Sequence, residues 1–455
     1  MFLGFSVVYG LRVNLSVAMV AMVNTTDPDA TKNSSVIHAC PLPSGAENGS
    51  QTFQQPIPQY PWDSETQGWL LGAFFFGYLC TQIPGGYLAG HYGGSIFLGL
   101  GVLGTAVLTL FTPLAAKWGS YWLFALRALE GFGEVGGSMM AMWARWAPPL
   151  ERSRLTTLSG SGSSFGAFLA LPLTGYICEQ LGWPAVFYIC GGAGCFWAVL
   201  WFAFVSDDPR THRRISDEER DYIINSIGPQ GTGHGWTLPL LSMMLSVPLW
   251  AIILTQMSAN WAFYTLLTSL PTYMSDILHF DLQSVRLWFC CIGMDHVLIY
   301  FQSVSRALLI RIMLFLGKIP PQKANVQLFL VAVNYAGCDH ILTVTFFTLS
   351  SSLGGTSAPG VYINQIDIAP RYAGFLLGIT NTFGTIPGVL APIVTGYFTE
   401  DHSLAGWRKV FWVAAGINLG GAIIYLLLGT ADIQPWANPD EEGVRQQKRR
   451  GESIS

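Results

Sequence analysis

The stretch that decides the fold is Leu126–Glu134, which reads LRALEGFGE and lies inside an apolar run that covers about residues 121–143. A run of about 20 residues, at a rise of about 1.5 Å per residue, crosses the hydrocarbon core of a bilayer. A charge near the bilayer centre costs roughly 2.5–3.5 kcal/mol or more, so charged residues there normally face a protein interior or a watery cavity. Arg127, Glu130 and Glu134 are spaced three and four residues apart and therefore share one helix face. This pattern indicates either a structural ion pair that pins two helices or a site that handles protons or anions in a transporter.

The composition of the whole chain is that of a membrane protein. Hydrophobic residues make up 51% of its 455 residues and charged residues only 11%, against about 25% charged residues in soluble domains. Because backbone polar groups in lipid must be satisfied within each segment, the recurring apolar runs predict an all-α polytopic membrane protein. The sequence contains no GxSxG or HExxH motif and no nucleotide-binding glycine loop, which argues against an enzyme. We expect no cofactor, no metal and no nucleic-acid partner.

Ten apolar runs are long enough to cross a bilayer as helices. Their expected positions are residues 2–22, 66–90, 96–115, 121–143, 158–181, 184–205, 249–273, 342–363, 372–398 and 410–428.

Residues 284–336 are irregular. Two further helices are needed there to keep the later segments on a consistent side, but Asp295 and His296 interrupt the first and Lys318, Pro320 and Pro321 the second. The expectation is therefore about twelve helices in two six-helix halves.

The expected organisation follows from that helix count. The first half covers residues 1–205, a polar central loop covers 206–245, the second half covers 246–430, and a polar tail covers 431–455.

Two independent features predict the orientation in the membrane. The polar loop 24–61 contains three N-glycosylation sequons, at Asn24, Asn33 and Asn48, which is typical of a lumenal or extracellular segment. Arginine clusters lie in the loops that fall on the other side by helix parity, as the positive-inside rule requires of cytosolic loops. We therefore expect the N-terminus and the tail in the cytosol.

Arg12 is the only charged residue of the first expected helix. It lies near the middle of that helix, where its side chain cannot easily reach the membrane surface, so it should face a cavity or a carboxylate. A planar guanidinium binds a carboxylate through two hydrogen bonds. We interpret Arg12 as the anchor for an anionic substrate, with a structural ion pair as the alternative.

Several polar side chains near the middle of expected helices are candidates for binding hydroxyl groups of a substrate. These are Tyr78, Asn260, Tyr264, Asn364 and Asn381. For the three amides and for Tyr264, helix–helix packing is the alternative, because such groups also join neighbouring helices by hydrogen bonds. For Tyr78 the alternative is an aromatic wall.

The sequence resembles the anion and phosphate transporter branch of the major facilitator superfamily, over nearly its whole length. The resemblance rests on residues 11–18 (LRVNLSVA), 62–69 (WDSETQGW), 82–87 (QIPGGY), 103–113 (LGTAVLTLFTP), 146–153 (WAPPLERS), 260–261 (NW), 264–267 (YTLL), 366–370 (IDIAP) and 377–382 (LGITNT). It implies a secondary transporter without cofactors, embedded in the lipid bilayer as a monomer.

The resemblance also implies a function. It points to a proton-coupled exporter of sialic acid and other acidic sugars from the lysosome. Arg12 matches the branch's first-helix arginine, implied to hold the substrate carboxylate, and Glu130 and Glu134 match an acidic pair implied in proton coupling. Alternatives are a vesicular or plasma-membrane carrier of aspartate, glutamate or sodium-dependent phosphate, and a relative that does not transport.

The sequence also departs from the branch. The cytosolic leader with a lysosomal sorting signal is not present before Phe2, the segment between Glu134 and Trp143 is about two residues shorter than the pattern, and residues 284–326 do not resemble it. Two residues correspond to about 200° of helix rotation, so one side of the fourth expected helix must be rearranged.

We predict distinct roles for the charges of that helix. Arg127 should hold Glu130, while Glu134 should be the main proton carrier. In an acidic lumen a protonated Glu134 would leave Arg12 free for the anion, and in the neutral cytosol the ionised Glu134 would compete for Arg12.

Overall fold

The structure is a computed structural model of the chain. It describes residues 1–23, 59–134, 137–148, 151–212, 214–227, 240–277, 331–350 with gaps at 338, 340, 344 and 348, the residues 364, 368 and 369, and then 373–401, 403–430 and 432–437. The expected sequons at Asn24, Asn33 and Asn48 and most of the irregular segment 284–336 lie outside the described residues.

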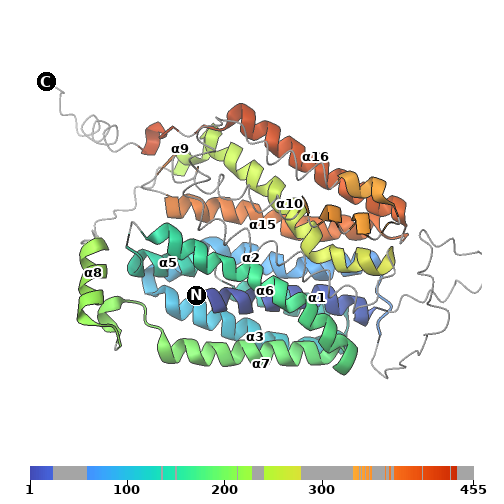
Figure 1. Ribbon diagram of the computed structural model, residues 1–455, viewed down its shortest axis with the longest axis horizontal. Helices are drawn as coiled ribbons and strands as arrows, with labels where there is room; N and C mark the ends of the chain where they lie inside the picture. Colours follow the sequence, from blue (N-terminus) through green and yellow to red (C-terminus); the bar gives the residue numbers. More distant parts are fainter. Residues whose placement is uncertain are drawn as a thin grey trace, which may run out of the picture.

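Helices account for the regular structure of the described residues, and Figure 1 shows them side by side in one bundle. The long helices are α1 (Phe2–Met22), α2 (Ser64–Tyr92), α3 (Gly94–Trp118), α4 (Ser120–Gly133), α5 (Gly137–Trp146), α6 (Arg152–Leu181), α7 (Trp183–Phe204), α10 (Val247–Asp276), α15 (Ala373–Phe398) and α16 (Leu404–Leu428). Shorter elements are η2 (Pro209–Thr211), α8 (Asp217–Ile227), α9 (Leu240–Met244) and η4 (Pro435–Ala437). By length and composition, α1, α3, α7 and α16 are able to cross a membrane.

The two ends of the bundle are the Met22 end and the Phe2 end, after the residues at which α1 ends and begins. At the Met22 end, α1 finishes and α2 begins, and at the Phe2 end, α1 begins and α2 finishes. The expected positions agree closely with the helices that are described: α1 has the expected bounds, and the other helices agree to within about six residues at each end. The exception is the expected helix 121–143, which the structure divides into α4 and α5.

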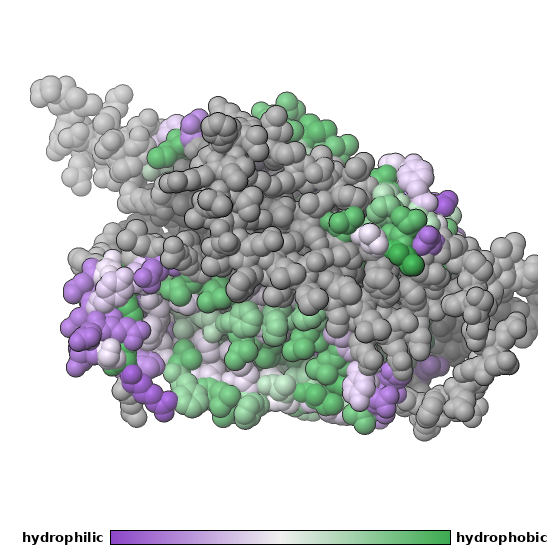
Figure 2. All heavy atoms as spheres, viewed as in Figure 1, coloured by the Kyte–Doolittle hydropathy of each residue, from purple (hydrophilic) through white to green (hydrophobic). Residues whose placement is uncertain are grey.

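The flank of the bundle is apolar. Large hydrophobic side chains such as Phe196, Val199 and Phe202 of α7 are exposed. In Figure 2, apolar residues spread along the lower flank of the bundle, and hydrophilic residues gather at the Phe2 end, where α8 lies. An apolar flank with polar groups at the end is what a bundle of membrane-spanning helices requires.

Helices α2 and α15 run antiparallel and touch at backbone level toward the Met22 end. A Cβ atom added to Gly68 would lie 2.5 Å from the carbonyl oxygen of Pro392, and one added to Gly72 would lie 3.0 Å from that of Val389. Only glycine permits this approach. Toward the Phe2 end, longer side chains separate the same two helices, since Gln82 of α2 reaches Asn381 of α15 through a hydrogen bond between their amides.

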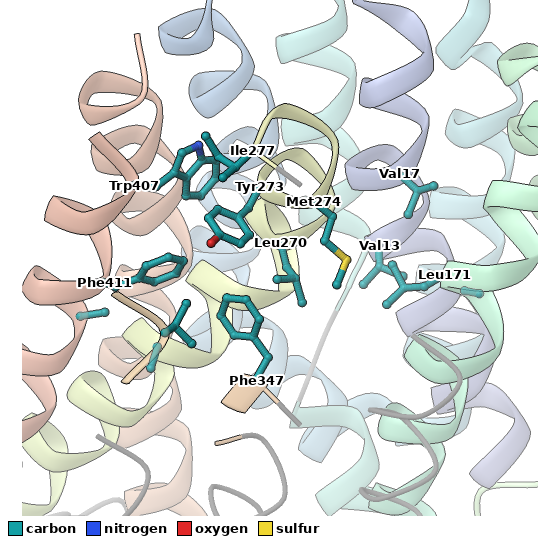
Figure 3. Packing of buried hydrophobic residues seen from close by; sticks show 14 residues of the cluster. Val13, Val17, Leu171, Leu270, Tyr273, Met274, Ile277, Phe347, Trp407 and Phe411 are labelled. Carbon is teal, nitrogen blue, oxygen red and sulfur yellow. The ribbon is translucent and has the colours of Figure 1, made fainter. Parts of the chain in front are cut away.

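A second contact closes the Met22 end between α1, α6 and α10. Figure 3 shows Val13 and Val17 of α1 and Leu171 of α6 facing Met274 of α10 in one buried hydrophobic cluster. The same cluster continues through Tyr273 to Trp407 and Phe411 of α16, where the aromatic rings pack edge to face. The helices that precede and follow the central segment therefore pack together at the Met22 end.

Candidate functional site

The centre of the bundle holds a buried ion pair between Arg12 and Glu134. Arg12 lies midway along α1, and its Nη2 donates a hydrogen bond to Oε2 of Glu134. The side chains are only 4% and 6% exposed, so both charges are removed from water. In such an environment an unpaired charge is costly, which is why each group depends on the other.

Glu134 lies at a break in the helix rather than within it. Helix α4 ends at Gly133, Glu134 has an extended backbone (φ −82°, ψ 105°), and α5 starts at Gly137. The expectation of one continuous helix over residues 121–143 is therefore wrong. Glycine is a weak helix former, and Gly131 and Gly133 directly precede the break. Irregular backbone at this depth is tolerated where it is buried in protein, and it is common at the binding sites of transporters.

Four aromatic rings surround the guanidinium of Arg12, and we call them the ring cage. The Cζ atom of Arg12 lies 4.7 Å from the ring centre of Tyr9, 5.0 Å from Phe74, 5.8 Å from Phe75 and 4.8 Å from Tyr78. Rings at these distances attract a cation through their faces. The ring cage therefore supports the charge of Arg12 in addition to the contact with Glu134.

Arg127 and Glu130 form a second buried ion pair. Nη1 of Arg127 lies 2.6 Å from Oε2 of Glu130, and the two side chains are at most 2% exposed. Thr112 of α3 donates a hydrogen bond to Oε1 of the same carboxylate at 3.3 Å, and Thr105 donates to the backbone carbonyl of Glu130 at 3.1 Å. These two hydrogen bonds join α3 to α4 through the side chain and the backbone of Glu130. Such links are what a structural ion pair would provide.

Helix α4 is also fixed against α2. Cβ atoms added to Gly77 of α2 or Gly131 of α4 would overlap backbone carbonyl oxygens of the facing helix, those of Ala128 and Phe74 respectively. The helix that ends at Glu134 and the helix that carries most of the ring cage are therefore packed backbone to backbone.

The later helices bring two further predicted residues near this centre. The ring of Tyr264 in α10 packs at 4.7 Å against Phe75 of the ring cage. Asn260, one helical turn earlier, donates a hydrogen bond to the backbone carbonyl of Gly384 in α15 at 2.7 Å. The contact with the carbonyl makes Asn260 part of the packing between α10 and α15. We call the ring cage together with Tyr264 the aromatic layer, and Asn260 lies one turn from it.

The remaining two predicted residues occupy different places. Nδ2 of Asn381 in α15 donates a hydrogen bond to Oε1 of Gln82 in α2 at 3.0 Å, which links helices from the two ends of the sequence. Asn364 instead donates to the hydroxyl of Tyr425, close to the last turn of α16 at the Phe2 end. Asn364 is therefore not brought together with Arg12.

Sequence reasoning missed the ring cage residues Tyr9, Phe74 and Phe75, as well as Gln82. A signal for them was available, because Tyr9 precedes Arg12 by three residues, and Phe75, Tyr78 and Gln82 follow a spacing of three and four along one helix face. Polar residue type alone does not mark these rings. Among the described residues, no cluster of His, Cys, Asp and Glu has the arrangement of a metal site.

Comparisons with known proteins show the family to which this chain belongs. Residues 1–323 match the family model described as the Major Facilitator Superfamily. Among curated proteins, sialin from Homo sapiens is 46% identical over 462 residues, covering 98% of this chain and 90% of that protein. This chain belongs to the major facilitator superfamily and, within it, is a secondary transporter of the anion and phosphate branch, as the sequence resemblance predicted.

Other relatives belong to the same branch. A probable small intestine urate exporter from Homo sapiens is 38% identical and covers 94% of this chain and 88% of its own length. Sodium-dependent phosphate transport protein 3 from Mus musculus is 37% identical, with coverages of 94% and 91%. The chain is therefore a multi-pass membrane protein.

Solved structures agree on the fold. A D-xylose–proton symporter superposes with a TM-score of 0.67 at 12% identity, covering 95% of this chain and 98% of that one. A bacterial homologue of the human lysosomal transporter Spinster, in an inward-facing and unoccupied conformation, also has a TM-score of 0.67, at 12% identity and coverages of 94% and 95%. Identities this low establish the fold alone.

Proposed function

We propose that this chain is a proton-coupled transporter that exports sialic acid and related acidic sugars from the lysosome. The observation that carries the proposal is the buried Arg12–Glu134 pair, a cation and a carboxylate in contact, with the cation surrounded by the ring cage. The high identity with sialin supports the choice of substrate. The expected glycosylation of the loop 24–61 supports assigning the Met22 end to the lumen.

The mechanism is an exchange of partners at Arg12. In an acidic lumen, the carboxylate of Glu134 takes up a proton and becomes neutral, so its attraction for the guanidinium falls. Arg12 then binds the carboxylate of the substrate, which a planar guanidinium holds through two parallel hydrogen bonds. In the neutral cytosol Glu134 returns its proton to water, pairs with Arg12 again and displaces the anion.

The second ion pair has a supporting role in this mechanism. Arg127 holds Glu130 within α4, and Thr112 adds a hydrogen bond from α3. In this mechanism the charges of Arg127 and Glu130 act electrostatically on Glu134, and neither residue carries the transported proton. Glu130 thereby keeps its charge while Glu134 changes its own.

Transport further requires that the bundle open alternately at its two ends. The packed contacts at the Met22 end, which include Gly68 against Pro392 and Met274 near Val13, match a conformation closed toward the lumen. The formed Arg12–Glu134 pair fits this conformation, because the mechanism expects the pair to form once the anion has left toward the cytosol.

The proposal is tested with purified protein in liposomes. An inwardly directed proton gradient should drive uptake of labelled sialic acid, and a proton ionophore should abolish it. Uptake that survives the ionophore but requires sodium or a membrane potential would instead identify an ion-driven anion or phosphate carrier. The absence of uptake from a folded sample, for sialic acid, glutamate and phosphate alike, would identify a relative that does not transport.

A further inference from the structure

Helix α2 presents a continuous stripe of side chains to the centre of the bundle. Phe75, Tyr78 and Gln82 are spaced by three and four residues and therefore lie on one face. Phe75 and Tyr78 belong to the ring cage of Arg12. Gln82 lies one turn beyond Tyr78, about 6 Å further toward the Phe2 end. An amide thus follows directly after the aromatic layer.

Gln82 is a buried polar group that is only partly satisfied. The residue is 5% exposed, and its Oε1 accepts a hydrogen bond from Nδ2 of Asn381 at 3.0 Å. Within the described part of the chain, its Nε2 has no hydrogen-bond partner. Such a donor is costly to leave unpaired in an apolar interior, so a buried amide in this state points to a missing acceptor.

The facing helix α10 places a second amide within about one turn of Gln82 along the bundle. Asn260 lies one turn before Tyr264 on α10, on the side of the Phe2 end, just as Gln82 lies one turn from Tyr78. Its Nδ2 reaches the carbonyl of Gly384, which is one turn from Asn381 on α15. Amides from three helices therefore gather around α15 next to the aromatic layer.

The charged side chains and the neutral amides occupy different positions along the bundle axis. Arg12 and Glu134 contact each other beside the ring cage, whereas Gln82 lies one turn from Tyr78 of that cage and Asn260 lies one turn from Tyr264, which packs against it. A carboxylate held by Arg12 would leave the rest of its molecule beside the amides. Neutral amides offer both donors and acceptors, which is the requirement for binding hydroxyl groups.

We propose that Gln82 is a specificity-determining residue that binds a hydroxyl or carbonyl oxygen of the substrate through its free Nε2, with Asn381 holding it in position. The ligand class is a carboxylic acid that carries neutral polar groups about one sugar ring away from its carboxylate. The proposal rests on the proposed function of Arg12 as the carboxylate anchor, and it adds the part of the site that distinguishes acidic sugars from simple carboxylates.

The alternative role for Gln82 is a latch between α2 and α15. A latch affects the equilibrium between conformations and therefore changes the apparent affinity of every ligand by the same factor. A specificity residue changes the affinity only for ligands that carry a partner for its donor. The ratio of two affinities, rather than either affinity, distinguishes the two roles.

The experiment compares two ligands of similar size that differ in their hydroxyl groups. Glucuronate and cyclohexanecarboxylate both carry one carboxylate on a six-membered ring, and their binding is measured in detergent by thermal stabilisation, without any gradient. For Gln82→Leu we expect the affinity for glucuronate to fall about fivefold to tenfold and that for cyclohexanecarboxylate to stay within about twofold. Thr81→Val is the matched control, because among the described residues the hydroxyl of Thr81 donates to the carbonyls of Gly77 and Tyr78 in its own helix.

The other outcomes overturn the inference. An equal fall in affinity for both ligands in Gln82→Leu would identify a latch between α2 and α15. An unchanged affinity for both would show that Gln82 is not part of the binding site. Suppose that both ligands bind the wild type, that their binding requires Arg12, and that Gln82→Leu leaves the ratio of their affinities unchanged. The inference then fails and the proposed function stands. A wild type that binds neither ligand would overturn the proposed function together with the inference.

Discussion

Arg12 and Glu134 are 122 residues apart in the sequence and share one buried hydrogen bond at the centre of the bundle. The first lies in the middle of α1, and the second lies at the break that separates α4 from α5. Each charge is therefore held in place by a residue from a distant part of the sequence. Changes to either member test both the stability of the bundle and its proposed transport cycle.

Replacing Glu134 with glutamine should uncouple transport from the proton gradient. Glutamine keeps the shape of the side chain but cannot exchange a proton, so the pH gradient should no longer drive accumulation. Exchange of labelled for unlabelled sialic acid across the same membrane should continue, because it needs only binding and alternate opening. Gradient-driven uptake at the wild-type rate in Glu134→Gln would contradict the assignment of Glu134 as the proton carrier.

Replacing Arg12 with alanine should abolish binding of the anion. It also leaves Glu134 as an unpaired buried group, so we expect a loss of about 3–5 kcal/mol in stability if Glu134 stays ionised. The double variant Arg12→Ala with Glu134→Gln should recover most of the melting temperature but no transport. If a substrate still protected Arg12→Ala from a covalent inhibitor, the anchor role of Arg12 would be wrong.

The Arg127–Glu130 pair should be replaceable as a unit. Removing one partner leaves a buried charge and should destabilise the protein by about 3–5 kcal/mol, whereas Arg127→Met with Glu130→Leu should be near neutral. The melting temperatures of the single and double variants measure this difference. Loss of proton-driven uptake in a stable double variant would show that this pair does more than support Glu134.

A leucine at Gly68 should prevent closure of the Met22 end. The added side chain meets the backbone of Pro392, and overpacking of about 1–3 kcal/mol shifts a conformational equilibrium by roughly fivefold or more. Transport should fall accordingly, while the protein stays folded and binds its substrate. Gly104→Leu is the control, since a Cβ atom there meets no atom of the described residues within 4 Å. Equal transport by both variants would show that this contact does not limit the cycle.

The sequence predicted those parts of the structure that depend on local spacing. Long apolar runs marked the helices, and the bounds of α1 were found as expected. Arg127 and Glu130 are three residues apart, so their contact follows from helix geometry alone. The burial of the intramembrane charges could also be predicted, because lipid gives them no alternative.

Other parts depend on contacts between distant segments and could not be read locally. No spacing rule relates Arg12 to Glu134, and the continuous apolar run hid the break at Glu134 because hydropathy does not distinguish one helix from two. The rings of Phe74 and Phe75 resembled ordinary packing residues. Asn364 had the right residue type but lies beside Tyr425, because its depth in the bundle depends on the tertiary arrangement.

The backbone-to-backbone packing of α2 and α4 at Gly77 and Gly131 has a consequence for energy conservation. Among the described residues, the hydrogen bond of the Glu134 carboxylate runs to Arg12 of α1, so a proton can enter or leave Glu134 without breaking a described hydrogen bond to α10 or α15. We therefore expect that proton exchange alone does not move the later helices. Only a bound anion that also contacts those helices can couple proton exchange to their movement. A ligand too small to reach them should therefore allow protons to cross the membrane without transport of the ligand.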